Sequence, residues 1–444
     1  MSEMFKPPTT NSYIKPRIII HGGAGNLTRT SIPRCRYDEY RVSLDRILAK
    51  SADLLSKPGI SALDVATYAV SLLEDDPLYN SGKGAVFTRG GENELECSIM
   101  VSNGYKKRGV GCMMLKHVKN PVKLARELLV RGEEEDGGSG DAQDHCQYSG
   151  EFVEGLAEKW GLDIVDQGYF FTQKRWDEHE RGLAEEKTRE EQGLKVNEMS
   201  EWEKENYIPL GTCGAVVLDS FGTICTATST GGLTNKVPGR IGDTPTIGAG
   251  FWAEEWFDRE EVSLGKTKML YQPATCAASP IEKLSKGDLR GVVGDCLPSL
   301  SSTPIPKFTE FSKQRHEKPI PTRRAVALSG TGNGDTFLRL CSARTTAAKS
   351  RFSSCALSTA TTWMAGPGGE LQRSAGDRWG KVHEGVGGII GIEIVGKKVE
   401  VVADYNCGGM FRAWTEADGS RRCLVFREDS WESGPEKITA WTGS

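Results

Sequence analysis

The sequence predicts an α+β protein with layered sheets. Helical and hairpin patterns fall in separate clusters along the 444 residues, whereas a parallel α/β sheet requires strands and helices in alternation. The β-branched segment 16–25 is a continuous apolar run ending in a glycine turn, which indicates a buried central strand. Hairpin patterns at 212–228 and 387–405, the second turning at 396–398, supply antiparallel strands. No internal repeat is present.

Helix signals separate these strands. Ser61 opens a helix with Asp64 at capping-box spacing, and Pro121 stands at the first position of another that stops at Gly132. The remaining expected elements are helices at 151–160 and 335–349, paired strands over 85–100, and a strand over 324–329.

Three segments lack a folding pattern. Residues 1–16 are expected to be a disordered lead-in to a single domain over 17–444. From 174 to 205, 18 of 32 residues are charged, so the segment is expected to be a mobile linker, since it has little apolar surface to offset its ordering entropy. The Ser-, Pro- and Lys-rich stretch 256–324 is expected to be a surface insertion.

Composition excludes several classes of protein. The formal net charge is −4, from 56 basic and 60 acidic residues, which argues against a nucleic-acid or anionic-membrane partner. No run approaches the roughly 20 apolar residues that a membrane span needs. The 12 cysteines are scattered singly, which favours reduced thiols. With no signal-peptide pattern at the N-terminus, a cytoplasmic location is expected, and a nuclear one remains open.

Common catalytic motifs are absent. There is no G-x-S-x-G, H-E-x-x-H or G-x-x-x-x-G-K-[ST] pattern, and the six histidines show no paired ligand spacing. His21, beside glycines, fits a hydrogen-bonded core histidine. The loop 330–334, Gly-Thr-Gly-Asn-Gly, lacks dinucleotide spacing, but a strand and a helix flank it. Successive N–H groups there suit a phosphate, a carboxylate or a developing oxyanion.

Thr212 carries the most specific chemistry in the sequence. It follows Gly211, opens a strand, and comes directly after the charged segment. A threonine hydroxyl needs a neighbouring base, and the α-amine of the same residue, with a pKa of about 7.7–8.0, would supply one if the preceding peptide bond were cut. Gly211 permits a strained bond that a residue with a Cβ would resist. A structural Gly-Thr before a strand is the alternative.

The residues around Thr212 resemble those of the plant-type L-asparaginase/isoaspartyl peptidase family. The similar segments are Thr212-Cys-Gly-Ala-Val-Val-Leu, Thr228-Ser-Thr-Gly-Gly-Leu-Thr-Asn-Lys-Val-Pro-Gly-Arg-Ile-Gly-Asp243, Ile18-Ile-Ile-His-Gly-Gly-Ala-Gly25 and Tyr79-Asn-Ser-Gly-Lys-Gly-Ala-Val-Phe87. The resemblance covers 17–165 and 207–255, and more loosely 324–349. It implies a four-layer αββα sandwich, the N-terminal nucleophile hydrolase fold, cut into an α segment (1–211) and a β segment (212–444).

The resemblance also implies roles for single residues. Thr212 would be the nucleophile, freed by cleavage after Gly211, and Thr230 would hydrogen-bond its hydroxyl. Thr331 and Gly332 would form the oxyanion hole. The residues that would bind substrate are Arg240 at the α-carboxylate, Asp243 at the α-ammonium, Gly332, Gly334, and Asn80 near the site.

The same resemblance implies an autocatalytically matured hydrolase of L-asparagine and β-aspartyl dipeptides. Relatives pair as homodimers of cleaved αβ units and need no redox or nucleotide cofactor. A structural sodium ion would be held by backbone carbonyls in one loop, those of Leu73, Glu74, Asp76, Tyr79, Ser81 and Lys83.

Alternatives and departures remain. An uncleaved, non-catalytic scaffold is one alternative, and a threonine-aspartase-like endopeptidase is another. The latter and the lysosomal glycosylasparaginases carry Asp before the threonine, where this chain has Gly211. Cys213 stands where the family usually has Val, and Asp335 where Glu is common. With the insertion, these departures affect the expected substrate range more than the expected catalysis.

Overall fold

The computed structural model describes residues 14–104, 106–193, 211–258 and 322–436. The described residues up to 257 and from 323 onward form one compact unit, which the segment 258–322 interrupts in sequence. The elements described below belong to this unit, and they confirm the α+β class.

An eight-stranded sheet carries the first half of the chain and its C-terminal strands. In spatial order it runs β12-β11-β1-β5-β6-β2-β3-β4, antiparallel except between β3 and β4. The strands are β1 (Arg17–Gly25), β2 (Leu95–Val101), β3 (Gly109–Leu115), β4 (Gln147–Ser149), β5 (Cys213–Leu218), β6 (Ile224–Thr230), β11 (Gly409–Thr415) and β12 (Arg421–Leu424).

A four-stranded sheet contains the remaining strands in the order β10-β9-β8-β7. These are β7 (Phe251–Asp258), β8 (Thr322–Gly332), β9 (Gly387–Val395) and β10 (Lys398–Tyr405). The predicted hairpins correspond to β5–β6 and β9–β10, and the second turns at Gly396 with φ +61°.

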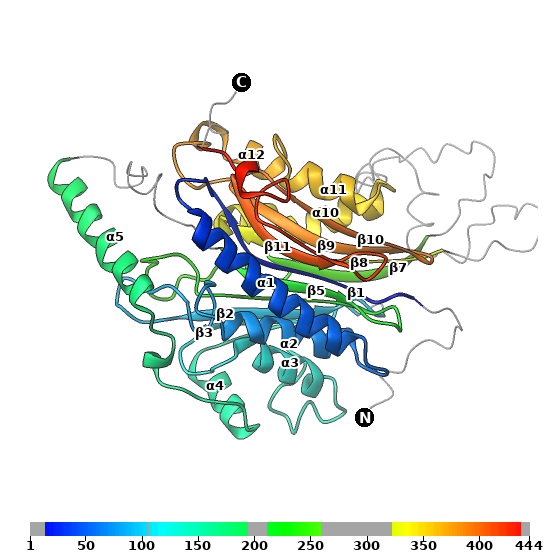
Figure 1. Ribbon diagram of the computed structural model, residues 1–444. Helices are drawn as coiled ribbons and strands as arrows, with labels where there is room; N and C mark the ends of the chain where they lie inside the picture. Colours follow the sequence, from blue (N-terminus) through cyan, green and yellow to red (C-terminus); the bar gives the residue numbers. More distant parts are fainter. Residues whose placement is uncertain (1–13, 105, 194–210, 259–321, 437–444) are drawn as a thin grey trace, which may run out of the picture. The chain divides into compact units, whose positions relative to one another are not determined.

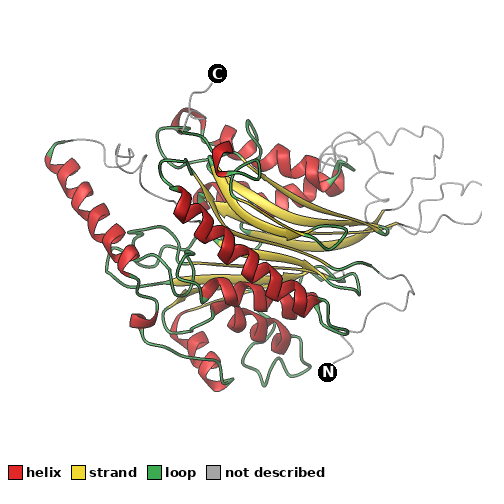
Figure 2. Cartoon of the chain, viewed as in Figure 1, coloured by secondary structure: helices red, strands yellow, loops and turns green. Residues whose placement is uncertain are grey.

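Helices pack on a face of each sheet, as Figures 1 and 2 show. The helices on the first sheet are α1 (Arg34–Leu55), α2 (Ala62–Glu74), α3 (Pro121–Gly132) and α4 (Gly150–Lys159). The helices associated with the second sheet are α9 (Gly334–Leu340), α10 (Ser342–Phe352), α11 (Leu357–Ala365) and α12 (Glu370–Ser374). β1 and β5 contact β9, so the two sheets also face each other.

β1 lies between two hydrophobic cores. Ile18 and Ile20 belong to the core beneath α1, α2 and α3, whereas Ile19 belongs to the core shared with the second sheet. Alternate side chains of a strand point to opposite faces, so a strand covered on both faces must be apolar throughout. This explains the continuous apolar run from which the strand was predicted.

Helix caps follow the sequence signals where these are strong. Ser61 caps α2 by accepting a hydrogen bond from the Asp64 N–H, and Pro121 starts α3. The 22-residue helix α1 was not identified from the sequence, although Tyr40, Leu44 and Ile47 are buried on one face of it.

Two predicted elements are wrong in their limits. The paired strands over 85–100 reduce to β2 and one isolated bridge, Thr88 with Lys236, because β2 pairs with β3 and β6 instead.

The single helix predicted at 335–349 is two helices, α9 and α10. They separate at Cys341, whose φ of 49° lies in the left-handed region and breaks the helical ladder.

The linker prediction for 174–205 is wrong over its first half, where α5 (Gln173–Glu191) forms. Thr172 caps this helix, and three side chains anchor it: Arg175 and His179 are buried, and the Trp176 ring meets Phe87 edge-on at 5.2 Å. A few anchoring side chains are therefore enough to hold this helix in place, although most of its residues are charged. Residues 194–205 lie outside the described part of the chain.

The other segment limits also change. Ile14 is buried in the core shared by the two sheets, so the ordered chain begins before residue 17. Strands β7 and β8 extend into both ends of 256–324, and residues 259–321 lie outside the described part. Within the described residues, no helix combines the length and apolar character needed to cross a bilayer.

Candidate active site

The predicted cleavage site lies where the start of β5 meets the end of β8. Thr212 directly precedes β5 and is 6% exposed. A Cβ on Gly211 would lie 2.3 Å from Thr331 Oγ1 and 3.2 Å from the Gly332 nitrogen. Residue 211 must therefore be glycine for its backbone to approach these two groups so closely.

Strand β1 also packs closely against the cleavage site. At Gly23, where φ is +120°, a Cβ would lie 2.9 Å from the Gly211 nitrogen. Two residues earlier, His21 Nε2 is 2.7 Å from Ser329 Oγ, and burial lowers the His21 pKa to about 3. His21 is thus a neutral core histidine that ties β1 to β8, as its sequence context predicted.

Thr331 and Gly332 present polar groups to the Gly211 backbone. Thr331 Oγ1 is buried, and it has no hydrogen-bond partner among the described residues. Gly332 adopts φ +144°, and a Cβ there would lie 2.3 Å from the Val386 carbonyl oxygen. An unpartnered buried hydroxyl is costly unless a ligand or a reacting group engages it. Its place beside Gly211 is suited to stabilising an oxyanion.

The hydroxyl that contacts Thr212 belongs to Thr244, not to Thr230. The Thr212 and Thr244 Oγ1 atoms are 2.8 Å apart, and Thr244 is fully buried. Thr230 lines the same pocket, but its hydroxyl accepts a hydrogen bond from the Gly232 N–H at 3.0 Å. The structure thus shows the Thr212 hydroxyl in contact with Thr244, while the Thr230 hydroxyl accepts a hydrogen bond from the turn that follows β6.

Sequence reasoning missed Thr244 because it lies in an irregular loop, where threonine has no distinctive spacing. The loop 231–250 folds back beside β6, and the Thr228 hydroxyl donates to the Thr244 carbonyl oxygen at 3.3 Å. Thr228 in turn contacts Ser98 on β2. These contacts fix the loop, and with it the hydroxyl that faces Thr212.

The predicted substrate-binding residues come together in the pocket. A Cβ on Gly334 would lie 2.6 Å from Asp243 Oδ1 and 3.0 Å from an Arg240 guanidinium nitrogen. Arg240 also forms an ion pair with Asp335 at 3.2 Å. A guanidinium next to a buried carboxylate presents the two charges that complement an α-amino acid zwitterion.

Glu96 on β2 is a second buried acid in this cluster, and the sequence analysis did not single it out. It accepts a hydrogen bond from the Gly242 N–H at 2.9 Å. Burial, with the Glu96 carboxylate nearby, raises the pKa of Asp243 to about 7. Burial also raises the pKa of Glu96. An acidic residue on an otherwise apolar central strand was the available signal for Glu96.

Asn80 shapes the turn that follows β6. Its side-chain amide donates to the Gly232 carbonyl oxygen at 2.8 Å, and its backbone carbonyl accepts from the Gly231 N–H at 3.0 Å. A Cβ on Gly231 would lie 2.8 Å from Asn80 Oδ1. The structure therefore places Asn80 behind the pocket wall, in contact with the chain that leaves Thr230.

The loop after α2 is the segment whose backbone carbonyls were predicted to hold a sodium ion. The Glu74 carbonyl accepts the Lys83 N–H at 2.7 Å, which closes the loop on itself. A Cβ on Gly84 would lie 2.3 Å from the Tyr79 carbonyl oxygen and 2.7 Å from that of Pro77, so carbonyl oxygens line the interior. Carbonyl oxygens are ligands that suit hard cations.

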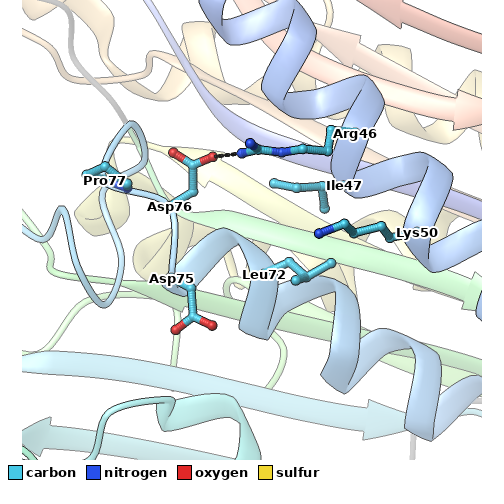
Figure 3. Close-up of a pocket in the computed structure, with 7 residues that line it drawn as sticks. All are labelled: Arg46, Ile47, Lys50, Leu72, Asp75, Asp76 and Pro77. Carbon is cyan, nitrogen blue, oxygen red and sulfur yellow. Dashed lines mark hydrogen bonds and ion pairs between the residues drawn. The ribbon is translucent and has the colours of Figure 1, made fainter.

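Side chains at the start of this loop hold it against α1. A cavity of about 220 Å³ separates α1 from the loop, and Figure 3 shows Asp76 turned toward Arg46 across it. Asp76 accepts hydrogen bonds from Arg46 at 2.8 Å and from Ser43 at 2.6 Å. Asp75 points away from Arg46 and accepts a hydrogen bond from Asn120 at 3.0 Å.

A larger cavity of about 580 Å³ joins these groups. Thr212, Thr230 and Gly211 line it, and so do Arg240 and Asp243. The other predicted residues on its wall are Gly332 and Gly334. One pocket thus holds a candidate nucleophile, a candidate oxyanion donor and a paired-charge recognition site, which is the arrangement that acyl transfer from an amino-acid amide requires.

Comparison with known proteins also identifies relatives, whose names describe isoaspartyl peptidases and L-asparaginases. The family model described as Asparaginase matches residues 14–257. The chain is 37% identical over 261 residues to a putative isoaspartyl peptidase/L-asparaginase of Dictyostelium discoideum, covering 54% of this chain and 71% of the relative. It is 38% identical over 239 residues to an isoaspartyl peptidase of Escherichia coli, with 54% and 68% covered. An isoaspartyl peptidase/L-asparaginase of Bos taurus is 32% identical over 241 residues, with 54% and 68% covered.

Proposed function

Because this chain belongs to the asparaginase family, we propose that it hydrolyses the side-chain amide of L-asparagine and the β-aspartyl bond of isoaspartyl dipeptides. The observation that carries the proposal is the close approach of Gly211 to Thr331 and Gly332, in the pocket that also holds Arg240 and Asp243. β8 lies beyond the residues that the family model matches, so this juxtaposition is evidence independent of that match.

Maturation would start with attack of Thr212 Oγ on the Gly211 carbonyl carbon. The C–N bond breaks as the C–O bond forms, the amide nitrogen takes up the hydroxyl proton, and water then hydrolyses the resulting ester. Thr331 Oγ1 and the Gly332 N–H, which lie next to Gly211, would stabilise the negative oxygen of this intermediate. The product would be two segments, 1–211 and 212–444.

The mature site would use the same groups on substrate. Arg240 would bind the α-carboxylate, and Asp243 the α-ammonium. The freed amine of Thr212 would accept its hydroxyl proton as Oγ attacks the β-carbonyl carbon, then deliver that proton to the leaving ammonia or amine. Water would hydrolyse the aspartyl ester and release aspartate. Thr230 would act by holding the turn beside the site rather than by contacting Thr212 directly.

The surrounding architecture supports this assignment. We propose that the two facing sheets with their outer helices form the four-layer αββα sandwich of N-terminal nucleophile hydrolases. Backbone carbonyls of the 73–83 loop would bind a structural sodium ion and so keep Asn80 in place. A homodimer of cleaved units and a cytoplasmic location complete the proposal; the ten described cysteines are all free thiols, consistent with a reducing compartment.

A side-by-side assay of L-asparagine and β-aspartyl dipeptides on the purified protein tests the activity. Release of aspartate from either substrate is the expected result. Protein that has the Thr212 amine free but hydrolyses neither substrate would refute the proposed activity.

Thr244 is expected to position the nucleophile. Thr244→Val removes the hydroxyl 2.8 Å from Thr212 Oγ1 with little change in volume, so kcat should fall about 10-fold to 100-fold with KM nearly unchanged. Thr244→Ser keeps a hydroxyl and should restore most of the rate. Thr246→Val, two residues along the same loop, is the matched control. Equal kcat for Thr244→Val and the wild type would show that Thr244 does not position the nucleophile.

Substrate binding is expected to depend on pH through Asp243. Its pKa of about 7 means that the carboxyl is neutral below pH 7 and charged above it. Only the charged form attracts the α-ammonium, so KM for asparagine should fall by up to about tenfold as the pH rises from about 6 to about 8. Asp243→Asn should give a higher KM that varies little over this range. A flat KM in the wild type would contradict the assignment.

A further inference from the structure

The active-site pocket extends beyond the reacting groups to one face of α5. The helix lies at the edge of the fold, beside the sheets (Figure 1). Six of its residues line the pocket at spacings that place them on one side of a helix. They are Glu178, Arg181, Gly182, Glu185, Glu186 and Arg189. Nothing in the proposed hydrolysis of asparagine uses this face.

Contacts with the loop 231–250, which lines the pocket, hold α5 in this place. A Cβ on Gly182 would lie 2.6 Å from Asn235 Nδ2, so the helix approaches the loop closely at its one glycine. Asn235 Nδ2 donates to the His179 carbonyl at 3.1 Å, and its Oδ1 contacts the His179 ring. The same loop continues to Arg240. The helix is therefore packed against the segment that carries the proposed carboxylate-binding residue.

The outer part of the pocket is strongly charged, and several of its carboxylates already have cationic partners. Glu178 pairs with Arg175 at 2.7 Å, and Glu186 pairs with Arg89 at 2.8 Å. Elsewhere in the pocket lining, Glu384 pairs with both Arg339 and Arg378. Arg181 and Arg189 add two further cations, with Glu185 four residues from each. Such a wall favours a charged, hydrogen-bonding group over an apolar one, and Arg181 and Arg189 are the groups on α5 that suit a carboxylate.

We propose that this face of α5 forms an outer subsite for the leaving-group residue of a β-aspartyl dipeptide, with Arg181 and Arg189 interacting with its free carboxylate. The inference rests on the proposed function and narrows it. Asparagine releases only ammonia and leaves the subsite unused, whereas a dipeptide extends beyond the scissile nitrogen and ends in a carboxylate. A cavity of about 580 Å³ falls in the range of pockets that enclose ligands of this size and larger.

Charge reversal on α5 tests the subsite with two substrates and one matched control. Arg181→Glu and Arg189→Glu should each lower kcat/KM for β-aspartyl-alanine by about tenfold or more at low salt, with kcat/KM for asparagine changed less than about twofold. Lys187→Glu makes the same change in charge on the same helix, at a position outside the pocket lining, and should leave both values unchanged.

A substrate without the carboxylate isolates the interaction. The C-terminal amide of β-aspartyl-alanine should be a poorer substrate than the acid for the wild type, and this preference should shrink or reverse in Arg181→Glu and Arg189→Glu. Unchanged ratios of dipeptide to asparagine activity in both variants would overturn the subsite while leaving the proposed function intact. Wild-type protein active on neither substrate would instead overturn both.

Discussion

Replacing Thr212 by alanine is expected to give a chain that stays uncut and hydrolyses neither asparagine nor β-aspartyl dipeptides. The variant lacks the hydroxyl that would attack the Gly211 carbonyl, and the residue that would attack substrate is the same one. Residual activity should fall to background, because removal of a covalent nucleophile leaves only the contributions of binding and the oxyanion hole. A denaturing gel and an assay on the same preparation measure both effects.

Thr212→Ser is the matched control for this change. Serine keeps a hydroxyl and an α-amine and should therefore cleave and retain measurable activity. Normal cleavage between residues 211 and 212 in Thr212→Ala, detected by mass spectrometry, would show that the attacking group lies elsewhere.

Arg240→Ala should separate maturation from substrate binding. Arg240 pairs with Asp335 and lies beside Asp243, and it does not contact Thr212 among the interactions described. The variant should still cut itself. The Arg240 side chain is 16% exposed and would pair with the substrate carboxylate inside the pocket. The KM of the variant for asparagine should therefore rise about 100-fold, since truncating one partner of a buried charge pair costs about 2–5 kcal/mol.

A lysine at the same position refines this test. Arg240→Lys keeps the charge but loses the bidentate geometry, so its KM should fall between those of the wild type and Arg240→Ala. An unchanged KM in Arg240→Ala, with cleavage intact, would remove Arg240 from the substrate site.

Much of the fold could be predicted because its central strands have two covered faces. β1 and β5 read as continuous apolar runs, and β9 with β10 turns at a glycine where φ is positive. α5 was missed for the opposite reason. Its mean composition favours disorder, yet three anchoring side chains, Arg175, Trp176 and His179, fix it to partners distant in sequence.

The site was predictable where local sequence sets the geometry. Gly211 and Gly332 are required by backbone approaches that no other residue permits, and both were identified. Thr244 acts through a tertiary contact from an irregular loop, so no local pattern marks it. Glu96 stands out only as an acidic residue within an apolar strand, and its role depends on the tertiary contact with Gly242. The family resemblance implied that Thr230 would hydrogen-bond the Thr212 hydroxyl. In the structure the Thr230 hydroxyl accepts a hydrogen bond from the Gly232 N–H, and the hydroxyl that contacts Thr212 is that of Thr244.

The central claim is that a break in the backbone frees the amine of Thr212. The most direct measurement is the intact mass of freshly purified, active protein, combined with N-terminal sequencing. Two segments are expected, one ending at Gly211 and one beginning with Thr-Cys-Gly-Ala. Full hydrolytic activity in a preparation whose 211–212 peptide bond is intact in every chain would contradict the account.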